Sequence, residues 1–157
     1  MSLADTYIIF VLDGASYAVR SEHVLYVEML EHVTLVPNTA PAVDGVVFSR
    51  GQVVPAINLR VRFGLQRRSH DSTTRLIYLK VRERLVALIV DSAKEFQRIA
   101  ADMVRPVQET LVGIEGNYVE GVVTLKDRTV LVLDVGQVLT LEEITLPEGA
   151  PVPTAVS

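Results

Sequence analysis

The chain has 157 residues, of which 49% are hydrophobic, a formal net charge of −4 and no cysteine. The lack of cysteine excludes disulfides and thiolate metal sites, and the charge lacks the basic excess of most nucleic-acid binders. Mean hydropathy is high at +0.33, but residues 85–90 form one of the longest apolar runs, and a bilayer span needs about 18 residues. No export signal is visible at the N-terminus. We therefore expect a soluble, cytoplasmic, globular protein without membrane insertion.

The first third of the chain predicts three strands and a connector. Residues 7–20 form two β-rich runs around Asp13-Gly14, a strong turn signal, and so predict a hairpin. Residues 24–30 are apolar and rich in β-formers, which predicts a third strand. Residues 34–43 carry two prolines and an asparagine, which predicts a connector.

The most informative stretch is 44–62, DGVVFSRGQVVPAINLRVR. β-Branched residues on both sides of a turn at 50–52 predict two short paired strands. Pro55 within the second of these strands predicts an edge position, because proline has no amide hydrogen to donate. Asn58 stands where it can cap a helical turn that Gly64 closes.

The second half repeats this alternation of hairpins and polar segments. Residues 66–74 are polar without periodicity and predict an exposed loop, and 75–90 predicts a hairpin. A long linker between Phe96 and Glu120 precedes another hairpin at 120–133. The proline-rich tail 145–157 is expected to be disordered.

The two halves align with each other, which indicates an internal duplication. At an offset of 69 the matched pairs are Ile8/Ile77, Phe10/Leu79, Leu12/Val81, Tyr17/Val86, Val19/Leu88 and Val27/Phe96, and at an offset of 76 they are Gly45/Gly121, Val46/Val122, Val54/Val130, Ile57/Leu133 and Asn58/Asp134. Short apolar strands favour closure into small barrels, which removes exposed strand edges. We expect one all-β domain over 1–157, with barrel 1 at about 14–75, barrel 2 at about 76–135, and the terminal strands open to exchange between them.

Residues 43–64, VDGVVFSRGQVVPAINLRVRFG, resemble the hallmark segment of CheW-like domains, the adaptors of bacterial chemotaxis. The family pattern has a glycine, apolar residues, Arg-Gly, two apolar residues, proline and then Asp/Asn-Leu-Arg. Supporting matches lie at 10–19, at 90–95 and at 133–134. The resemblance covers about residues 7–141, and as a set these matches are specific.

The resemblance implies two pseudo-symmetric, five-stranded, SH3-like barrels side by side and a non-catalytic adaptor without a cofactor. It implies docking to the regulatory domain of a CheA-like histidine kinase, which has the same fold. It also implies that the helical cytoplasmic hairpin of a methyl-accepting chemoreceptor lies in an apolar groove between the barrels. The residues expected at the kinase and receptor interfaces are Val24, Tyr26, Val27, Gly45, Phe48, Arg50 and Pro55.

Two positions depart from the family pattern. Phe48-Ser49 replaces the usual Asn-Leu before Arg-Gly, and Tyr26 stands where an acidic partner for Arg50 is expected. Tyr26 is expected to accept a hydrogen bond from the Arg50 guanidinium or to stack under it. Several of these residues also have a structural interpretation: Gly45 serves backbone geometry, Val24 and Val27 belong to the core, and Arg50 is a solvated charge.

Catalysis is disfavoured, because the three histidines are far apart in sequence and no phosphate-binding loop or nucleophile elbow is present. Two alternatives to the chemotaxis adaptor remain. One is a stand-alone CheW-like interaction module in another pathway, such as motility or development. The other is a nucleic-acid-binding barrel that uses a local basic cluster made of Arg60, Arg62, Arg67, Arg68 and Arg75.

Overall fold

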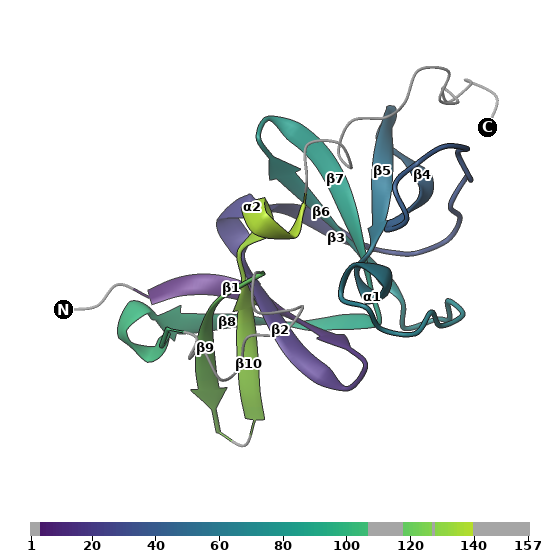
Figure 1. Cartoon of the computed structure of the whole chain (residues 1–157). Coiled ribbons are helices and arrows are strands. Elements are labelled where there is room, and N and C mark those ends of the chain that lie inside the picture. Colours follow the sequence, from purple (N-terminus) through teal and green to yellow (C-terminus); the bar gives the residue numbers. More distant parts are fainter. Residues whose placement is uncertain (1–3, 107–117, 127, 140–157) are drawn as a thin grey trace.

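The computed structural model describes residues 4–106, 118–126 and 128–139, and in them the chain forms two five-stranded sheets (Figure 1). Within these ranges the helical structure consists of two short α-helical turns, α1 and α2, and two 3-10 turns, η1 and η2. The elements are β1 (Ala4–Leu12), β2 (Ala15–Arg20), η1 (Ser21–His23), β3 (Val24–Met29), β4 (Val43–Ser49), β5 (Gln52–Asn58), α1 (Leu59–Arg62), β6 (Arg75–Val81), β7 (Arg84–Val90), β8 (Ser92–Ala100), η2 (Ala101–Met103), β9 (Val119–Leu125), β10 (Arg128–Leu133) and α2 (Val135–Val138). The predicted all-β class and the predicted hairpins are confirmed.

The two sheets exchange their hairpins. Sheet A has the strand order β8-β1-β2-β10-β9, and sheet B has the order β3-β6-β7-β5-β4. The N-terminal hairpin thus belongs with the last three strands, and β6 and β7 belong with β3 to β5. The expected barrel bounds of 14–75 and 76–135 do not follow the sheets. The exchange of strands between the halves was left open by the sequence, because the parallel pairings β2–β10 and β5–β7 join segments far apart in sequence, which local patterns do not specify.

The exchanged hairpins have two buried faces. In β1, Tyr7 and Ile9 pack in a core of sheet A, while Ile8, Phe10 and Leu12 pack in a larger core that both sheets share. In β6, Leu76 and Tyr78 face a core of sheet B, and Ile77 and Leu79 face the shared core. Successive side chains point to opposite faces of a strand. A strand buried on both faces must therefore be apolar throughout, which explains the short continuous apolar runs.

The duplication is visible in the backbone contacts of the glycines Gly45 and Gly121. Next to Gly45, Val46 exchanges two backbone hydrogen bonds of 2.8 Å with Thr34, and next to Gly121, Val122 exchanges bonds of 2.8 and 2.9 Å with Arg105. Gly45 has φ +149°, and a Cβ there would overlap the Thr34 carbonyl oxygen. Glycine is required at Gly45 because another backbone segment passes directly over it.

Both helical turns begin at the predicted caps. The Asn58 side chain accepts the N–H groups of Arg60 and Val61, and Asp134 accepts those of Gly136 and Gln137. These bonds satisfy amides that a helix start leaves without partners.

The prediction that Pro55 lies on an edge strand is wrong. Strand β5 lies between β4 and β7, and Pro55 is buried. The parallel register with β7 begins one residue later, at Ala56, which is how the sheet accommodates a residue that has no amide hydrogen.

The expected tail at 145–157 and residues 107–117 of the expected linker lie outside the described residues. The start of that linker is not a loop, because β8 runs to Ala100 and η2 follows it. No helix within the described ranges is long and apolar enough to cross a membrane.

Candidate functional site

The Arg50 side chain is held in place at the tip of the β4–β5 turn. Its backbone is left-handed, with φ 51°. The guanidinium carbon lies 3.7 Å from the centre of the Tyr26 ring, and one guanidinium nitrogen lies 3.8 Å from Glu28 Oε1. The side chain of Arg50 remains 66% exposed. An exposed arginine with a fixed orientation is well suited to binding a carboxylate on a partner, because little side-chain entropy remains to be lost.

Tyr26 is itself supported from below. Its hydroxyl lies 3.0 Å from Ser49 Oγ, and its ring packs on that of Tyr78 with centroids 4.5 Å apart. Burial raises the pKa of Tyr78 to about 12, and hydrogen bonding to Glu28 also acts in this direction. Tyr78 therefore stays protonated at neutral pH. Arg50, Tyr26 and Tyr78 form a stack, called the arginine stack below, that packs on β6, the neighbour of β3 in sheet B.

The arginine stack corrects one expectation from the sequence. The hypothesis that Tyr26 lies under the Arg50 guanidinium agrees with the geometry, but the acidic partner of Arg50 is not lost. Glu28, two residues further along β3, supplies it. Residues two apart share a face of a strand, so both side chains reach Arg50. The contacts connect β3 and β4, the two edge strands of sheet B.

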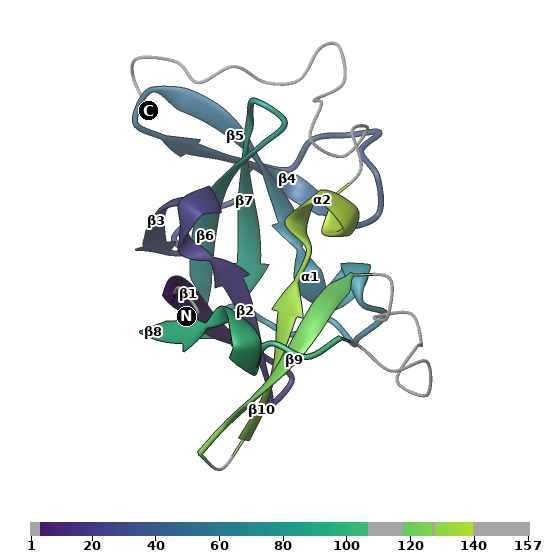
Figure 2. The same ribbon diagram turned by 90° about the vertical axis from the view of Figure 1, so that its left-hand side faces the viewer.

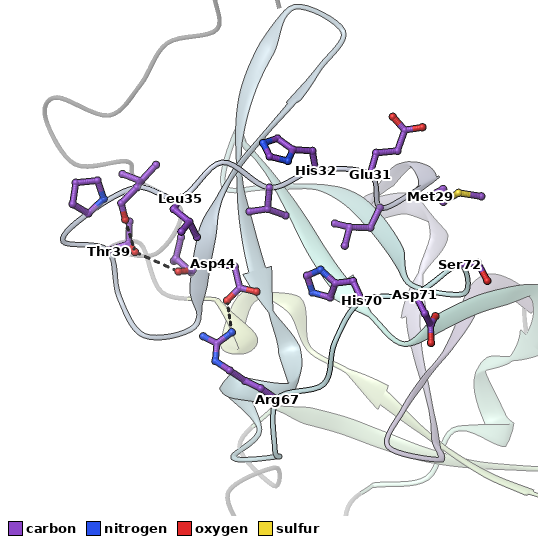
Figure 3. Close-up of a pocket in the computed structure, with 15 residues that line it drawn as sticks. Met29, Glu31, His32, Leu35, Thr39, Asp44, Arg67, His70, Asp71 and Ser72 are labelled. Atoms are coloured by element: carbon purple, nitrogen blue, oxygen red, sulfur yellow. Dashed lines mark hydrogen bonds and ion pairs between the residues drawn. The ribbon is translucent and has the colours of Figure 1, made fainter.

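Open hollows adjoin the arginine stack. Phe48, 40% exposed, lines one of about 480 Å³ together with Glu28, Met29 and Tyr78. A larger one, of about 1230 Å³, shares Met29 with it and lies between the connector that carries Leu35 and the loop that carries His70 (Figure 3). Met29 is 53% and Leu35 is 80% exposed. The surface beside Arg50 therefore combines exposed apolar side chains with charged ones.

A second apolar surface lies at the edges of the two sheets. Val24 and Val27 of β3 are half-buried and pack against the shared core, while Leu25 is 52% and Phe96 of β8 is 70% exposed. In Figure 2, β3 and β8 lie on the same side of the molecule, one above the other. Sequence reasoning did not select Phe96, although the offset of 69 pairs it with Val27 and was the available signal.

Two of the expected interface residues do not reach the surface. Gly45 and Pro55 are both buried. Gly45 lies under Thr34, and Pro55 lies within sheet B. Their direct effect is on the backbone that carries Phe48 and Arg50.

An ion cluster that the sequence did not reveal joins the two sheets. Arg60 of α1, nine-tenths buried, binds Asp91 through two bonds of 2.8 and 2.7 Å. Asp91 also accepts the Asp13 N–H at 2.9 Å. Burial acts to raise the pKa of Asp91, but the Arg60 and Asp13 bonds and the charges of Arg60 and Arg68 outweigh it and hold the pKa below its usual value. The cluster connects α1 after β5, the β1–β2 turn and the β7–β8 corner.

The basic cluster of the sequence is largely neutralised within the chain. Besides Arg60, Arg67 lies 2.9 Å from Asp44, and Arg68 lies 2.8 Å from Asp71. Arginines paired in this way have less charge available for a phosphate backbone. Among the described residues, no group of three histidine, aspartate or glutamate side chains is placed to hold a metal ion.

The fold and the site define a small two-sheet β module whose surface combines an ordered arginine with exposed apolar side chains. The chain belongs to the CheW-like domain family, whose model matches residues 6–143. The resemblance predicted from the sequence is therefore confirmed.

Named relatives agree with this assignment. The chain is 30% identical over 148 residues to the chemotaxis protein CheW of Klebsiella aerogenes, covering 94% of this chain and 89% of that protein. It is 29% identical over 135 residues to the chemotaxis protein CheW of Bacillus subtilis, covering 86% of each. The crystal structure of the scaffolding protein TtCheW from Thermoanaerobacter tengcongensis has the same fold, with a TM-score of 0.82, 23% identity, and coverage of 92% of this chain and 99% of that one.

Proposed function

We propose that this protein is a non-catalytic chemotaxis adaptor that couples the cytoplasmic tip of a chemoreceptor to a CheA-like histidine kinase. Membership of the CheW-like family supports the proposal, as do relatives named as chemotaxis proteins. The observation that carries it is the arginine stack. Arg50 is exposed at a turn tip but fixed by Tyr26 and Glu28, which is the arrangement of an interface anchor.

The kinase contact is assigned to the arginine stack and Phe48. Phe48 supplies apolar area beside Arg50, while Gly45 and Pro55 shape the backbone of the β4–β5 hairpin. The receptor contact is assigned to the β3 surface, where Val24 and Val27 lie, extended by Phe96. A helical hairpin that docks here would bury the exposed apolar side chains.

The test of the kinase contact is calorimetric titration with the regulatory domain of a CheA-like kinase from the same genome. We expect one-to-one binding that is micromolar or tighter, and Arg50→Glu should weaken it by roughly tenfold or more. The melting temperature should hardly change, because a charge exposed at a turn contributes little to folding. Lys126→Glu is the matched control, since Lys126 lies at the same place in the β9–β10 turn and is also exposed.

Each other result has a defined meaning. Equal weakening by Arg50→Glu and Lys126→Glu would remove Arg50 as a specific anchor. Loss of folding in Arg50→Glu would make the stack structural. A folded wild-type protein that binds no kinase would contradict the chemotaxis proposal and favour an interaction module of another pathway. For the receptor contact, Val24→Ala should weaken receptor binding with only a modest loss of thermal stability.

A further inference from the structure

A cationic hollow lies beside α2, at the corner that corresponds to the ion cluster beside α1. It measures about 280 Å³. It is lined by residues of β2, η1, the β6–β7 hairpin, β9, β10 and α2. The charged and titratable lining residues are Arg20, His23, Lys80, Arg82, Glu120 and Asp134.

The two offsets of the duplication make this hollow the counterpart of the ion cluster around Arg60 in the other copy. The offset of 76 pairs Arg60 with Gly136, and the offset of 69 pairs Asp13 with Arg82. Beside α1, the Arg60 side chain fills the corner and approaches Asp13 to 3.6 Å. Beside α2, residue 136 has no side chain, and Arg82 donates a 3.0 Å hydrogen bond to its carbonyl oxygen. The hairpin turn beside α1 carries the acidic Asp13, and the hairpin turn beside α2 carries the basic Arg82.

The space over Gly136 is open. A Cβ placed on Gly136 would have a single neighbouring atom within 4 Å among the described residues, Asp134 Oδ1 at 3.3 Å. The backbone of Gly136 is also not left-handed. The backbone conformation therefore does not require glycine here, and a side chain at residue 136 would require only a small shift of the Asp134 carboxylate.

The charges in the hollow are unbalanced. Its two acids are already engaged, since Glu120 binds Arg20 at 3.0 Å and Asp134 caps α2. Lys80 has a 3.5 Å contact with Glu83, whose side chain is 91% exposed. Within the described ranges, the Gly136 carbonyl is the hydrogen-bond partner of the Arg82 guanidinium. Arg82 and Lys80 thus retain donors for a further acceptor.

We propose that this hollow receives an acidic side chain of the chemoreceptor hairpin, with the carboxylate between Arg82 and Lys80. The inference rests on the proposed function and deepens it. Charge complementarity selects an acid. The partner is the receptor because the hollow is continuous with the proposed receptor surface: His23 lines the hollow, and the next residue, Val24, begins that surface. One helix lying along β3 would present its acid to the hollow while its apolar side chains cover Val24 and Val27.

The test compares two arginines of one hairpin. Arg82 lines the hollow, and Arg84 is exposed nearby in β7 without lining it. The probe is the purified cytoplasmic hairpin of a chemoreceptor from the same genome, titrated into the full chain at low and physiological salt. Arg82→Glu should weaken binding by roughly tenfold or more and reduce its salt dependence, whereas Arg84→Glu should stay within about twofold of wild type.

A second variant fills the hollow from within. Gly136→Glu places a carboxylate beside Arg82 and requires only a small shift of the Asp134 carboxylate, so it should fold with little change in melting temperature and lose receptor affinity to a similar extent. Equal losses from Arg82→Glu and Arg84→Glu would overturn the proposal in favour of general charge attraction. Wild-type affinity in Arg82→Glu would overturn it outright. Failure of the proposed function is distinguishable, because the wild-type protein would then bind neither the receptor hairpin nor the kinase domain.

Discussion

The corners beside α1 and α2 occupy the same place in the two copies but hold the sheets together in different ways. Both helical turns start at a capping side chain, Asn58 or Asp134, and both meet the hairpin turn of the other sheet. Beside α1 the contact is an ion cluster around a guanidinium that is nine-tenths buried. Beside α2 the polar contact to the other sheet, among the described residues, is a hydrogen bond from Arg82 to a backbone carbonyl.

The two copies share the features that define the backbone and differ in the side chains at these corners. Caps, glycines and strand registers define the backbone path, and a change in any of them disturbs every residue that follows. Side chains at the corners are less constrained, because either corner needs only enough contact to hold the sheets. The α1 corner therefore holds an ion cluster that joins the two sheets, and the α2 corner holds the hollow proposed to receive a partner. Variants at matched positions can test this difference.

The largest effect is expected for Asp91→Asn at the α1 corner. The change leaves the buried Arg60 charge without its carboxylate, and breaking a buried ion pair in this way costs about 3–5 kcal/mol. Urea denaturation at neutral pH measures the loss in the free energy of unfolding. Glu83→Gln is the control, since its exposed pairing with Lys80 should contribute almost nothing. If Asp91→Asn lowers the free energy of unfolding as little as this control does, the ion cluster does not hold the two sheets together.

The same pair gives a pH dependence. Because the folded state holds the pKa of Asp91 below its usual value, its stabilisation is complete above about pH 4 and is lost as pH falls through the folded-state pKa. Below about pH 4 the free energy of unfolding should therefore fall less steeply in Asp91→Asn than in wild type. The pKa of Asp71 is also lowered, but Asp71 is present in both proteins and cancels in the difference.

A smaller but asymmetric effect is expected when the paired glycines are changed to alanine. A Cβ on Gly45 meets the carbonyl of Thr34, which is rigid backbone, and φ there is +149°, so Gly45→Ala should cost about 3 kcal/mol. A Cβ on Gly121 meets the Val104 side chain and, less closely, the Arg105 carbonyl oxygen, and φ there is not left-handed, so Gly121→Ala should cost less, about 1–2 kcal/mol. Paired thermal and urea unfolding give both values. Equal costs would mean that both sites are crowded by backbone alike.

The smallest difference is expected between the two caps. Asn58 is buried, caps α1 and donates a 2.9 Å bond to Asp44, so Asn58→Ala should cost about 2 kcal/mol. Asp134 caps α2 at a more open corner, and Asp134→Ala should cost about 1 kcal/mol. The measurement is again the free energy of unfolding. A larger cost at Asp134 would reverse the ranking of the two corners.

Local features of the fold were predictable because they depend on neighbouring residues. Asp13-Gly14 predicted the first turn, short continuous apolar runs predicted β6 and β7, and Asn58 predicted the start of α1. The site was predictable in part. Arg50, Tyr26 and Phe48 follow from motif and resemblance, but Glu28 and Phe96 do not. Glu28 was missed because its distance to Arg50 depends on how the edges of sheet B meet, and Phe96 because apolar strand residues are normally buried.

The sequence by itself determined the β class, the duplication, the hairpins, the caps and the family, since each rests on local pattern or on matched spacing. Only the tertiary structure decided which hairpin joins which sheet. Strands such as β1 and β6 have two apolar faces, and their sequence does not distinguish the core of one sheet from the core shared by both. The same packing decided that Asp91 binds Arg60 while the corner over Gly136 stays open. Contacts between residues distant in sequence depend on the register of whole sheets, which short-range preferences do not encode.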